Sequence, residues 1–413
     1  MKNNELKLLN IYKILATTAT NLVGIFIPAM VYDITGKVWL AILYLCASNF
    51  LAYGIIHIIK DFLQRKPQLA LLLRTIPILC MEIFTVFIYN IPVISIVFIG
   101  LSMSWDMAIE SIACDSIFNY NADTSSAKSM SILYTFEKAG YVIATVLGGL
   151  FLDHLNLYIL IAVSVSLYLV SCVPLLRFYI KNRGNTTYNH DAISNAFIES
   201  KLIDEKQKKE KKELEKYVLR RYRALTFLNY GLENSYVVLT FMMFVSFGSY
   251  TMIGVADALF SLFYGLGIFA VGRCDERWEI ERMVTIFAIV SGVILVINGF
   301  VINSGVHYIV PIILLCVQAF IMAFPMVFCT NRMIMKGQIL GVSNKCVVYN
   351  QTMLNLNAGI TYIFGMFLPL WTMPLVAGLM VELSGFSIEK IEEQTRKKII
   401  RGMRDINENN KEV

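Results

Sequence analysis

The sequence predicts an all-α membrane protein with twelve transmembrane helices in two six-helix halves. The first observation is composition, since 57% of the 413 residues are hydrophobic and only 16% are charged, whereas a soluble domain carries about 25% charge. The second is that the apolar residues form repeated blocks of about 20, the length at which a helix crosses a bilayer. The third is that one charged segment divides these blocks into two equal sets. Together they exclude a soluble enzyme, a coiled coil, a disordered chain and a disulfide scaffold.

The twelve expected spans follow these apolar blocks, and short polar turns separate them. The first six cover residues 11–33, 38–60, 67–89, 92–117, 128–152 and 156–180. The second six cover residues 219–246, 250–271, 283–302, 307–329, 342–365 and 369–386. The last pair is the least sharply marked, because Pro369 and Pro374 obscure the position of the turn between them.

The span pattern divides the chain into four regions. Residues 1–180 form an N-terminal six-helix half, and residues 219–386 form a C-terminal six-helix half. Residues 181–218 form a cytoplasmic charged linker, which we expect to be solvated; contact with anionic headgroups is the alternative. Residues 387–413 form a cytoplasmic tail, with isoleucines among charges that suit either an amphipathic helix or a frayed end.

The basic residues predict the orientation, because Lys and Arg collect in cytoplasmic loops. With the N-terminus inside, the inner segments hold nearly all of them, whereas the outer turns hold only Lys37. We therefore expect an integral protein of the cell membrane with the linker and both termini in the cytoplasm. The outer turns are too short to form an external domain.

The turn after the second span contains a motif that resembles the GxxxDRxGRK loop of the major facilitator superfamily. Asp61, Arg65 and Lys66 match that pattern, whereas His57, Phe62 and Gln64 replace Gly, Arg and Gly. The fourth span ends at Asp115, which is similar to the acidic residue at the inner end of that span in the family. The resemblance implies an ion-pair latch on the inner face, formed by Asp61, Arg65, Lys66 and Asp115, that holds the outward-open state.

The fifth span resembles the antiporter motif GxxxGPxxGG of the same superfamily. Gly140, Gly148 and Gly149 match it, and Ala144 with Thr145 replaces Gly-Pro. Small residues of this kind let neighbouring helices pack closely. The resemblance, which covers the whole chain, implies a major-facilitator-type fold and a rocker-switch secondary transporter. Because the motif is typical of exporters, it favours export over uptake.

Acidic residues inside the spans are the first candidates for chemistry, since a charge in hydrocarbon costs roughly 2.5–3.5 kcal/mol on insertion scales. Asp106 and Glu110 lie four residues apart in the fourth span and therefore share a helical face. They suit proton coupling or recognition of a cationic group. The alternative is an acidic pair neutralised by a structural partner.

Lys138 in the fifth span is the partner that the sequence suggests for Glu110, and its other possible role is to hold an anionic group of a substrate. Glu233 in the seventh span shares a face with Asn229, and it is either a coupling acid or a packed structural one. Asp257 belongs to the eighth span, which should reach the cavity.

Several amides lie at similar depth in other spans. Asn21 lies in the first span, and Asn350 and Asn355 lie in the eleventh. Amides in lipid need hydrogen-bond partners, so these residues either join helices or form the wall of a hydrated cavity. All three are candidates for the cavity.

These features predict a secondary transporter that exports a small organic or amphiphilic solute by alternating access, coupled to protons or another ion. Its expected partners are the solute, the coupling ion and the lipid bilayer, and we expect a monomer. The alternatives are uptake of a sugar, nucleoside or peptide, and a non-transporting sensor or scaffold of the same fold. No metal-ligand, nucleotide-binding or protease motif and no basic–aromatic platform for nucleic acid is present, so no enzyme activity and no cofactor are expected.

Overall fold

The computed structural model describes residues 2–121, 127–181, 205–274, 280–340 and 342–409. Within the first half the helices are α1 (Lys2–Gly24), α2 (Ile27–Thr35), α3 (Val38–Arg65), α4 (Pro67–Leu73), α5 (Thr75–Val86), α6 (Pro92–Asn121), α7 (Ala127–His154) and α8 (Leu157–Lys181). Within the second half they are α10 (Glu205–Asn229), α11 (Gly231–Phe247), α12 (Tyr250–Cys274), α13 (Ile280–Asn303), α14 (Ile309–Leu340), α15 (Ser343–Phe367) and α16 (Thr372–Asn409).

Three of the expected spans are bent helices rather than single straight ones. The first is α1 followed by α2, and Pro28 lies in the first turn of α2, where its missing N–H costs no hydrogen bond. The third is α4 followed by α5, joined at Arg74. The seventh is α10 followed by α11, joined at Tyr230. Counted with these bends, the described residues form twelve helical rods in the predicted order.

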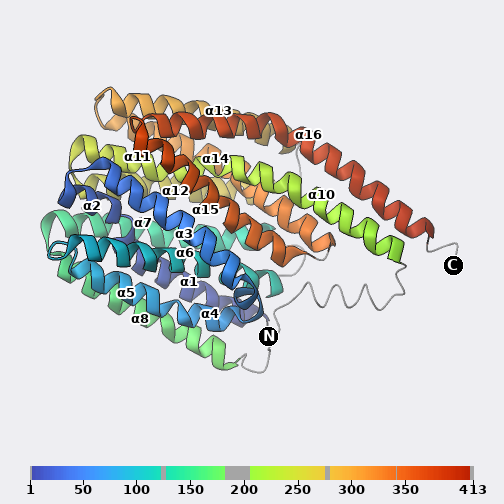
Figure 1. The fold of residues 1–413 in the computed structure, drawn as a ribbon, viewed down its shortest axis with the longest axis horizontal. Coiled ribbons are helices and arrows are strands. Elements are labelled where there is room, and N and C mark those ends of the chain that lie inside the picture. The colour runs from blue at the N-terminus through green and yellow to red at the C-terminus, as the bar shows by residue number, and fades with distance from the viewer. Residues whose placement is uncertain (1, 122–126, 182–204, 275–279, 341, 410–413) are drawn as a thin grey trace.

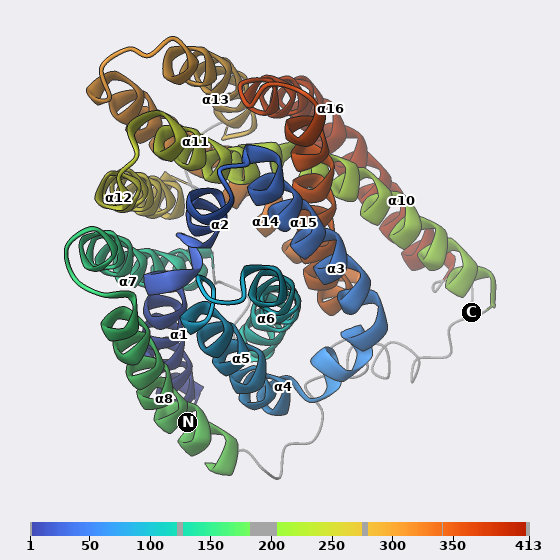
Figure 2. The same ribbon diagram turned by 60° about the vertical axis from the view of Figure 1, so that its left-hand side comes forward.

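The rods gather into two groups that face each other (Figures 1 and 2). Helices α1 to α8 form one group and α10 to α16 form the other. The groups meet chiefly where α7 packs on α12 and where α3 packs on α15. A large apolar core, which includes Phe26, Met30, Phe241 and Phe260, continues from one group into the other.

Eight helices among the described residues are long and apolar enough to span a membrane by length and composition. The rods that do not meet that criterion are α7, α10–α11, α15 and α16. Their polar residues are the reason, since α7 carries Glu137 and Lys138, and α15 carries several amides. As described below, three of these rods form walls of a cavity, where a polar side chain meets water rather than lipid.

The helix ends do not coincide with the expected limits of the linker and the tail. Helix α10 begins at Glu205, inside the expected linker, and runs into the seventh span without a break. Helix α16 likewise continues from the twelfth span to Asn409. The two helices pack together and run side by side away from the bundle (Figures 1 and 2). The described part of the tail, up to Asn409, is therefore a helix that packs on α10 rather than a frayed end.

Candidate functional site

A cavity of about 170 Å³ lies between the two helix groups. Helices α1, α6 and α7 line it from the first half, and α11, α12, α14 and α15 line it from the second. The lining residues all lie toward one end of the bundle. This is the end that holds the N-terminus of the chain and the linker, and it is the expected inner side. The polar residues that line it are Lys13, Ser111, Asp115, Glu137, Lys138, Glu233, Thr330, Asn331, Asn350 and Gln351.

Lys138 enters this cavity from α7, between two aromatic rings. Its Nζ lies 5.1 Å from the ring centre of Tyr141 and 5.3 Å from that of Tyr264 on α12. Both distances fit cation–π attraction. Among the described residues Lys138 forms no ion pair, so its charge is stabilised by aromatic faces that come from both halves.

Glu233 lines the cavity from the second half, in the first turn of α11 just after the bend at Tyr230. It is close enough to Lys138 and Glu137 to interact with them electrostatically. Within the part of the chain that the structure describes, Glu233 makes no hydrogen bond or ion pair. Its position agrees with a role in the cavity rather than with packing in a dry core.

The remaining cavity lysine is already paired. Lys13 on α1 lies 2.7 Å from Oε2 of Glu137 on α7, and both line the cavity. This ion pair joins two helices of the first half. Because Glu137 is paired with Lys13, it does not neutralise the adjacent Lys138. Lys138 therefore faces the cavity with no acidic side chain in contact among the described residues.

Asp106 and Glu110 lie outside the cavity lining, because both form ion pairs with Arg74. Arg74 is not among the candidate residues named from the sequence. The Arg74 guanidinium places Nε 2.5 Å from Oδ1 of Asp106 and Nη2 2.9 Å from Oε2 of Glu110. Tyr12 adds its hydroxyl 3.3 Å from Nη1. The partner of Glu110 is therefore Arg74 rather than Lys138, the partner that the sequence suggested.

Arg74 is buried completely at the junction of α4 and α5. The sequence did contain a signal for this role, because Arg74 is a cation inside an apolar span, and such residues pair within the bundle. Its pairing with α6 depends on which face of the third span meets the fourth. That relation is set by packing of the whole bundle and not by local pattern.

Asp257 on α12 is a buried acid that forms no ion pair with the described residues. Its side chain is fully buried. The Tyr236 hydroxyl lies within hydrogen-bond reach of its carboxylate, and Lys138 acts on it electrostatically; the same hydroxyl lies 2.9 Å from that of Tyr141. Asp257 thus lies behind the cavity wall, beside the aromatic groups that surround Lys138.

The candidate amides divide into structural and cavity residues. Asn229 is buried, donates to Cys329 and Pro325, and accepts from Ser384, so it joins helices. Asn21 and Asn355 each donate to the carbonyl four residues earlier in their own helix, at 2.8 and 3.1 Å. Neither of these two lines the cavity. Asn350 does line it, and its Oδ1 has no partner among the described groups.

The two halves are joined at the expected outer end by Asp153, which follows the fifth span. Its carboxylate accepts hydrogen bonds from the backbone N–H groups of Tyr250 and Thr251, at 3.1 and 2.7 Å, and from the Ser249 hydroxyl at 2.8 Å. These N–H groups begin α12 and have no partner within that helix. A carboxylate of one half therefore caps a helix of the other half and joins the two halves at this end.

Neither a protein-family model nor a curated protein sequence matches the chain, but solved structures do. The fucose:proton symporter of E. coli, a major facilitator superfamily transporter, matches 93% of this chain and 98% of its own, with a TM-score of 0.58 and 14% identity. A bacterial homologue of the iron transporter ferroportin, in its outward-facing state, matches 94% of this chain and 99% of its own, with a TM-score of 0.64 and 16% identity. The chain has the major facilitator fold. The fold class predicted from the sequence is confirmed.

In this major facilitator fold the residues of the expected inner latch belong to α3, the turn after it and α6. Asp61, Arg65 and Lys66 are exposed at the end of α3 and the turn after it, and none of them makes an ion pair with another described residue. Gln64, which replaces a glycine of the motif, instead donates to the backbone oxygen of Asn344 on α15 at 2.9 Å. Asp115 lies in the cavity wall. A role of these residues as a latch stays a prediction.

The small residues of α7 lie where other helices approach closely. A Cβ at Gly140 would lie 2.6 Å from Oγ1 of Thr18, and one at Gly148 would clash with Leu22 on the same helix, α1. Ala144, which lies between these two glycines in the sequence, is also buried. Gly149 faces the other half, where a Cβ would lie 2.6 Å from the Tyr250 oxygen. The glycine pattern thus serves packing within one half and contact between the halves.

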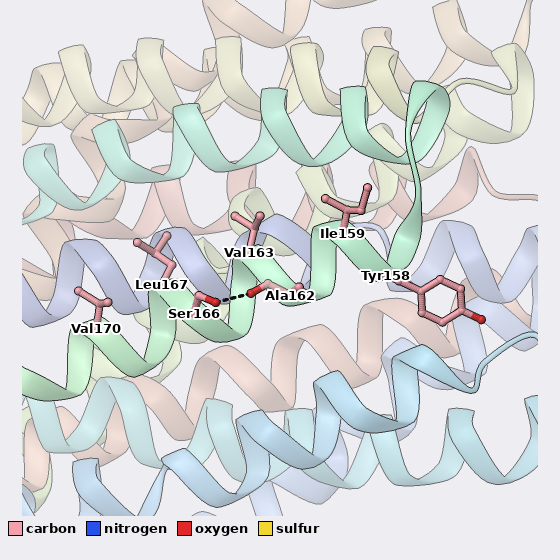
Figure 3. A pocket seen from close by; sticks show the side chains of 7 residues that line it. All are labelled: Tyr158, Ile159, Ala162, Val163, Ser166, Leu167 and Val170. Atoms are coloured by element: carbon pink, nitrogen blue, oxygen red, sulfur yellow. Dashed lines mark hydrogen bonds between the residues drawn. The ribbon is translucent and has the colours of Figure 1, made fainter.

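A second hollow lies on the outside of the bundle, along α8 alone (Figure 3). No charged side chain lines it, and Ser166 satisfies its hydroxyl on the backbone oxygen of Ala162 at 2.7 Å. Because it belongs to one helix and faces away from the other half, it has no part in the site between the halves. The residues that line it are Tyr158, Ile159, Ala162, Val163, Ser166, Leu167 and Val170.

Proposed function

We propose that the protein is a secondary active transporter that moves a small organic solute by alternating access. The observation that carries this proposal is the cavity between the halves, which is lined by charged side chains of both. The Asp153 contact joins the halves at the expected outer end. Repeat-built transporters place their sites between the repeats. Release of the Asp153 contacts and closure at the inner end would expose the same site to the other side.

The size of the cavity favours a compact solute. At about 170 Å³ it is smaller than the roughly 300–1,000 Å³ of sites for drug-sized ligands. A small polar molecule therefore suits this cavity better than a bulky amphiphile. Its charged lining supports a solute that carries charge.

We propose proton coupling through Asp257. A carboxylate that is fully buried without an ion-pair partner is more stable when protonated, so movement that brings it to water would release its proton. Asp106 and Glu110 are less suitable carriers because Arg74 already compensates them. The proposed direction is export, and the support for it is the antiporter-like glycine pattern of α7.

Uptake of a polar neutral solute, such as a sugar, is the second candidate. Asn331, Asn350 and Gln351 line the cavity, and amides of this kind hydrogen-bond hydroxyl groups. This candidate predicts that the charged pair across the cavity contributes little to binding.

We place the protein in the cell membrane, as a monomer, with both termini in the cytoplasm. Cysteine labelling tests the orientation in a variant without the eight native cysteines. Introduced at exposed Ser304, a cysteine should react with an impermeant reagent added to intact cells, and at exposed Lys212 it should react only after lysis. Reaction of both in intact cells would contradict the layout.

The transport test uses purified protein in liposomes that contain a pH-sensitive dye. Small amino acids, amines, carboxylates and sugars are added under an imposed proton gradient, and a coupled solute should change the rate of proton movement through the protein. Liposomes without protein and liposomes with Asp257→Asn protein are the controls. If no solute moves protons, and if radiolabelled solutes equilibrate no faster than in empty liposomes, the proposal is refuted.

A further inference from the structure

Two opposite charges from different halves face the same cavity without touching each other. Lys138 projects from α7 of the first half, and Glu233 projects from α11 of the second. They interact electrostatically, but no ion pair within 4 Å joins them among the described contacts. Each is partly exposed to the cavity rather than enclosed by protein.

The other basic group of the cavity does not compete for Glu233. Lys13 is held 2.7 Å from Glu137 by an ion pair within the first half. Lys138 therefore remains as the cationic side chain that can meet an incoming anion, and Glu233 is the acid opposite to it. Asp115, the remaining acid of the lining, already interacts with another residue. Lys138 and Glu233 are thus the lining charges that have no hydrogen bond or ion pair among the described residues.

The position of Lys138 is fixed by contacts with both halves. Its Cβ lies 3.5 Å from the place that a Cβ on Gly265 would occupy, and its ammonium group is near the rings of Tyr141 and Tyr264. Aromatic faces attract the cation but leave its hydrogen-bond donors available. The lysine side chain is therefore held in place while its N–H donors have no hydrogen-bond acceptor among the described residues. A group that binds a ligand is expected to meet both conditions.

Both charges lie inside a membrane bundle, where an ionised side chain is costly unless it meets water or an opposite charge. A solute with one charge would neutralise only one of them and would leave the other desolvated on binding. A solute with an anionic group at one end and a cationic group at the other would neutralise both. We propose that this cavity binds a small zwitterion, with its anionic group at Lys138 and its cationic group at Glu233.

Such a ligand would contact one charged group on each half. Its binding would therefore depend on how far apart the halves are, and this dependence links occupancy to conformation. The inference rests on the proposed function, because it names the solute of the same site. It is more specific, however, and it fails separately if the transported solute is neutral or carries a single charge.

The test measures binding of ω-amino acids to the purified full-length protein in nanodiscs. The probes run from glycine to 6-aminohexanoate, and each is compared with the carboxylate and the amine of matching length, and with glucose. Isothermal titration should show at least one amino acid that binds at least tenfold more tightly than both of its single-charge counterparts.

Two variants assign the ends of the ligand. Glu233→Gln should reduce the affinity for that amino acid to the level of the matching carboxylate, and Lys138→Gln should reduce it to the level of the matching amine. Lys212→Gln, at an exposed site on α10, is the matched control and should bind as the wild type does. Each variant is first checked for monodisperse elution and an unchanged Tm without ligand.

Three results would overturn the inference. One is that the single-charge counterparts bind as tightly as the amino acids, another is that glucose binds most tightly, and the third is that no amino acid in the series binds. In the second case proton-coupled movement of glucose in liposomes would leave the proposed transport function intact while the zwitterion assignment fails. If both glucose and the amino acids fail to bind and no solute moves protons, the transport proposal fails as well.

Discussion

The Arg74 guanidinium binds Asp106 through two of its nitrogens, with Nε 2.5 Å from Oδ1 and Nη2 3.2 Å from Oδ2. The same Nη2 lies 2.9 Å from Glu110. This cluster joins the bend between α4 and α5 to the middle of α6, within the first half. An acidic pair that shares a buried cation in this way serves the architecture of that half, whereas the cavity charges Lys138 and Glu233 come from different halves.

The first prediction concerns this cluster. The double variant Asp106→Asn/Glu110→Gln should lose stability, because it leaves Arg74 as an uncompensated buried charge; removal of one side of a buried pair costs about 3–5 kcal/mol. Addition of Arg74→Met should restore part of this loss, whereas addition of Lys138→Met should not. Thermal unfolding in detergent measures the effect. Rescue by Lys138→Met instead would show that the ion pairs are assigned wrongly.

Arg74 also shows where prediction from the sequence ends. The fold class, the twelve rods and most intramembrane charges were predictable, because hydropathy and span length act locally. Lys138 and Glu233 could be named as candidates for the same reason, because each is a charged residue within an apolar block. Which charges pair was not predictable, since the pairing of Arg74 with α6 depends on how helices far apart in the sequence face each other.

The second prediction concerns Asp257. Asp257→Asn should keep or raise the Tm, because it removes a fully buried carboxylate that forms no ion pair with the described residues and keeps its shape. Proton movement driven by the solute found in the liposome screen should be abolished, while equilibrium binding of that solute is retained. Asp106→Asn is the contrasting variant, and it should lower the Tm. Proton movement with wild-type pH dependence in the Asp257→Asn protein would exclude this residue as the carrier.

The third prediction concerns the outer contact between Asp153 and the first turn of α12. Asp153→Asn should favour separation of the outer ends, because an amide oxygen is a weaker acceptor than a carboxylate at a helix N-terminus. Spin labels at exposed Leu155 and Ser304, in a background without native cysteines, report the distance between the halves. A larger population of long distances is expected, and an unchanged distribution would show that Asp153 does not hold the outer end closed.

The same contact predicts the pH at which closure weakens. Burial raises the pKa of Asp153, but hydrogen bonds from Thr251, Ser249 and Tyr250 outweigh it, and the pKa is lowered. A carboxyl group with a lowered pKa contributes its full stabilisation above its ordinary pKa of about 3.9 and loses it as the pH falls through the lowered value. The spin-label distances should therefore be constant near neutral pH and should lengthen only in strong acid. Lengthening between pH 7 and 5 would contradict this assignment.

The fourth prediction uses the two adjacent glycines of α7. Gly149→Ala should open the outer end, because its Cβ would lie 2.6 Å from the Tyr250 oxygen and 2.9 Å from the Thr251 Cα across the interface between the halves. Such overpacking typically costs about 1–3 kcal/mol, and separation of the halves would relieve it. Gly148→Ala should lower the Tm without opening, because Leu22 belongs to the same half.

Gly54→Ala is the matched control for this pair, since nothing lies within 4 Å of a Cβ at that helical position. It should leave both the Tm and the spin-label distances close to wild type. An equal effect of Gly148→Ala and Gly149→Ala on the distances would show that the two glycines do not divide their contacts between the halves.

The charged tail illustrates the same limit of prediction as Arg74. Its isoleucines among charges suited either an amphipathic helix or a frayed end, and they did not indicate which helix the tail packs against. In the structure the extension of α16 lies along α10, and Leu214 and Val218 of α10 pack with Met333 and Ile334 of α14. Residues 205–218 of the linker and the described part of the tail are thus attached to the second half. This arrangement arises from contacts between segments more than 100 residues apart.

The fifth prediction concerns the polar cluster that joins these three helices. Nζ of Lys336 on α14 lies 2.5 Å from Oε1 of Glu392 on α16 and 2.6 Å from the hydroxyl of Tyr222 on α10, and that hydroxyl also donates to Glu392. All three residues are buried. Glu392→Gln should therefore destabilise the junction by up to about 3–5 kcal/mol, the range for a buried pair that loses one partner, and should release the end of α16.

Limited trypsin digestion measures this release, since cleavage at Lys397 and Lys398 should accelerate in the Glu392→Gln protein. Glu393→Gln is the matched control, because the neighbouring Glu393 forms an exposed pair with Lys397, and solvent-exposed pairs contribute little to stability. Lys336→Met combined with Glu392→Met should restore much of the resistance, since no buried charge is then left alone. Equal digestion rates for Glu392→Gln and Glu393→Gln would show that the buried cluster does not fasten the tail to α14.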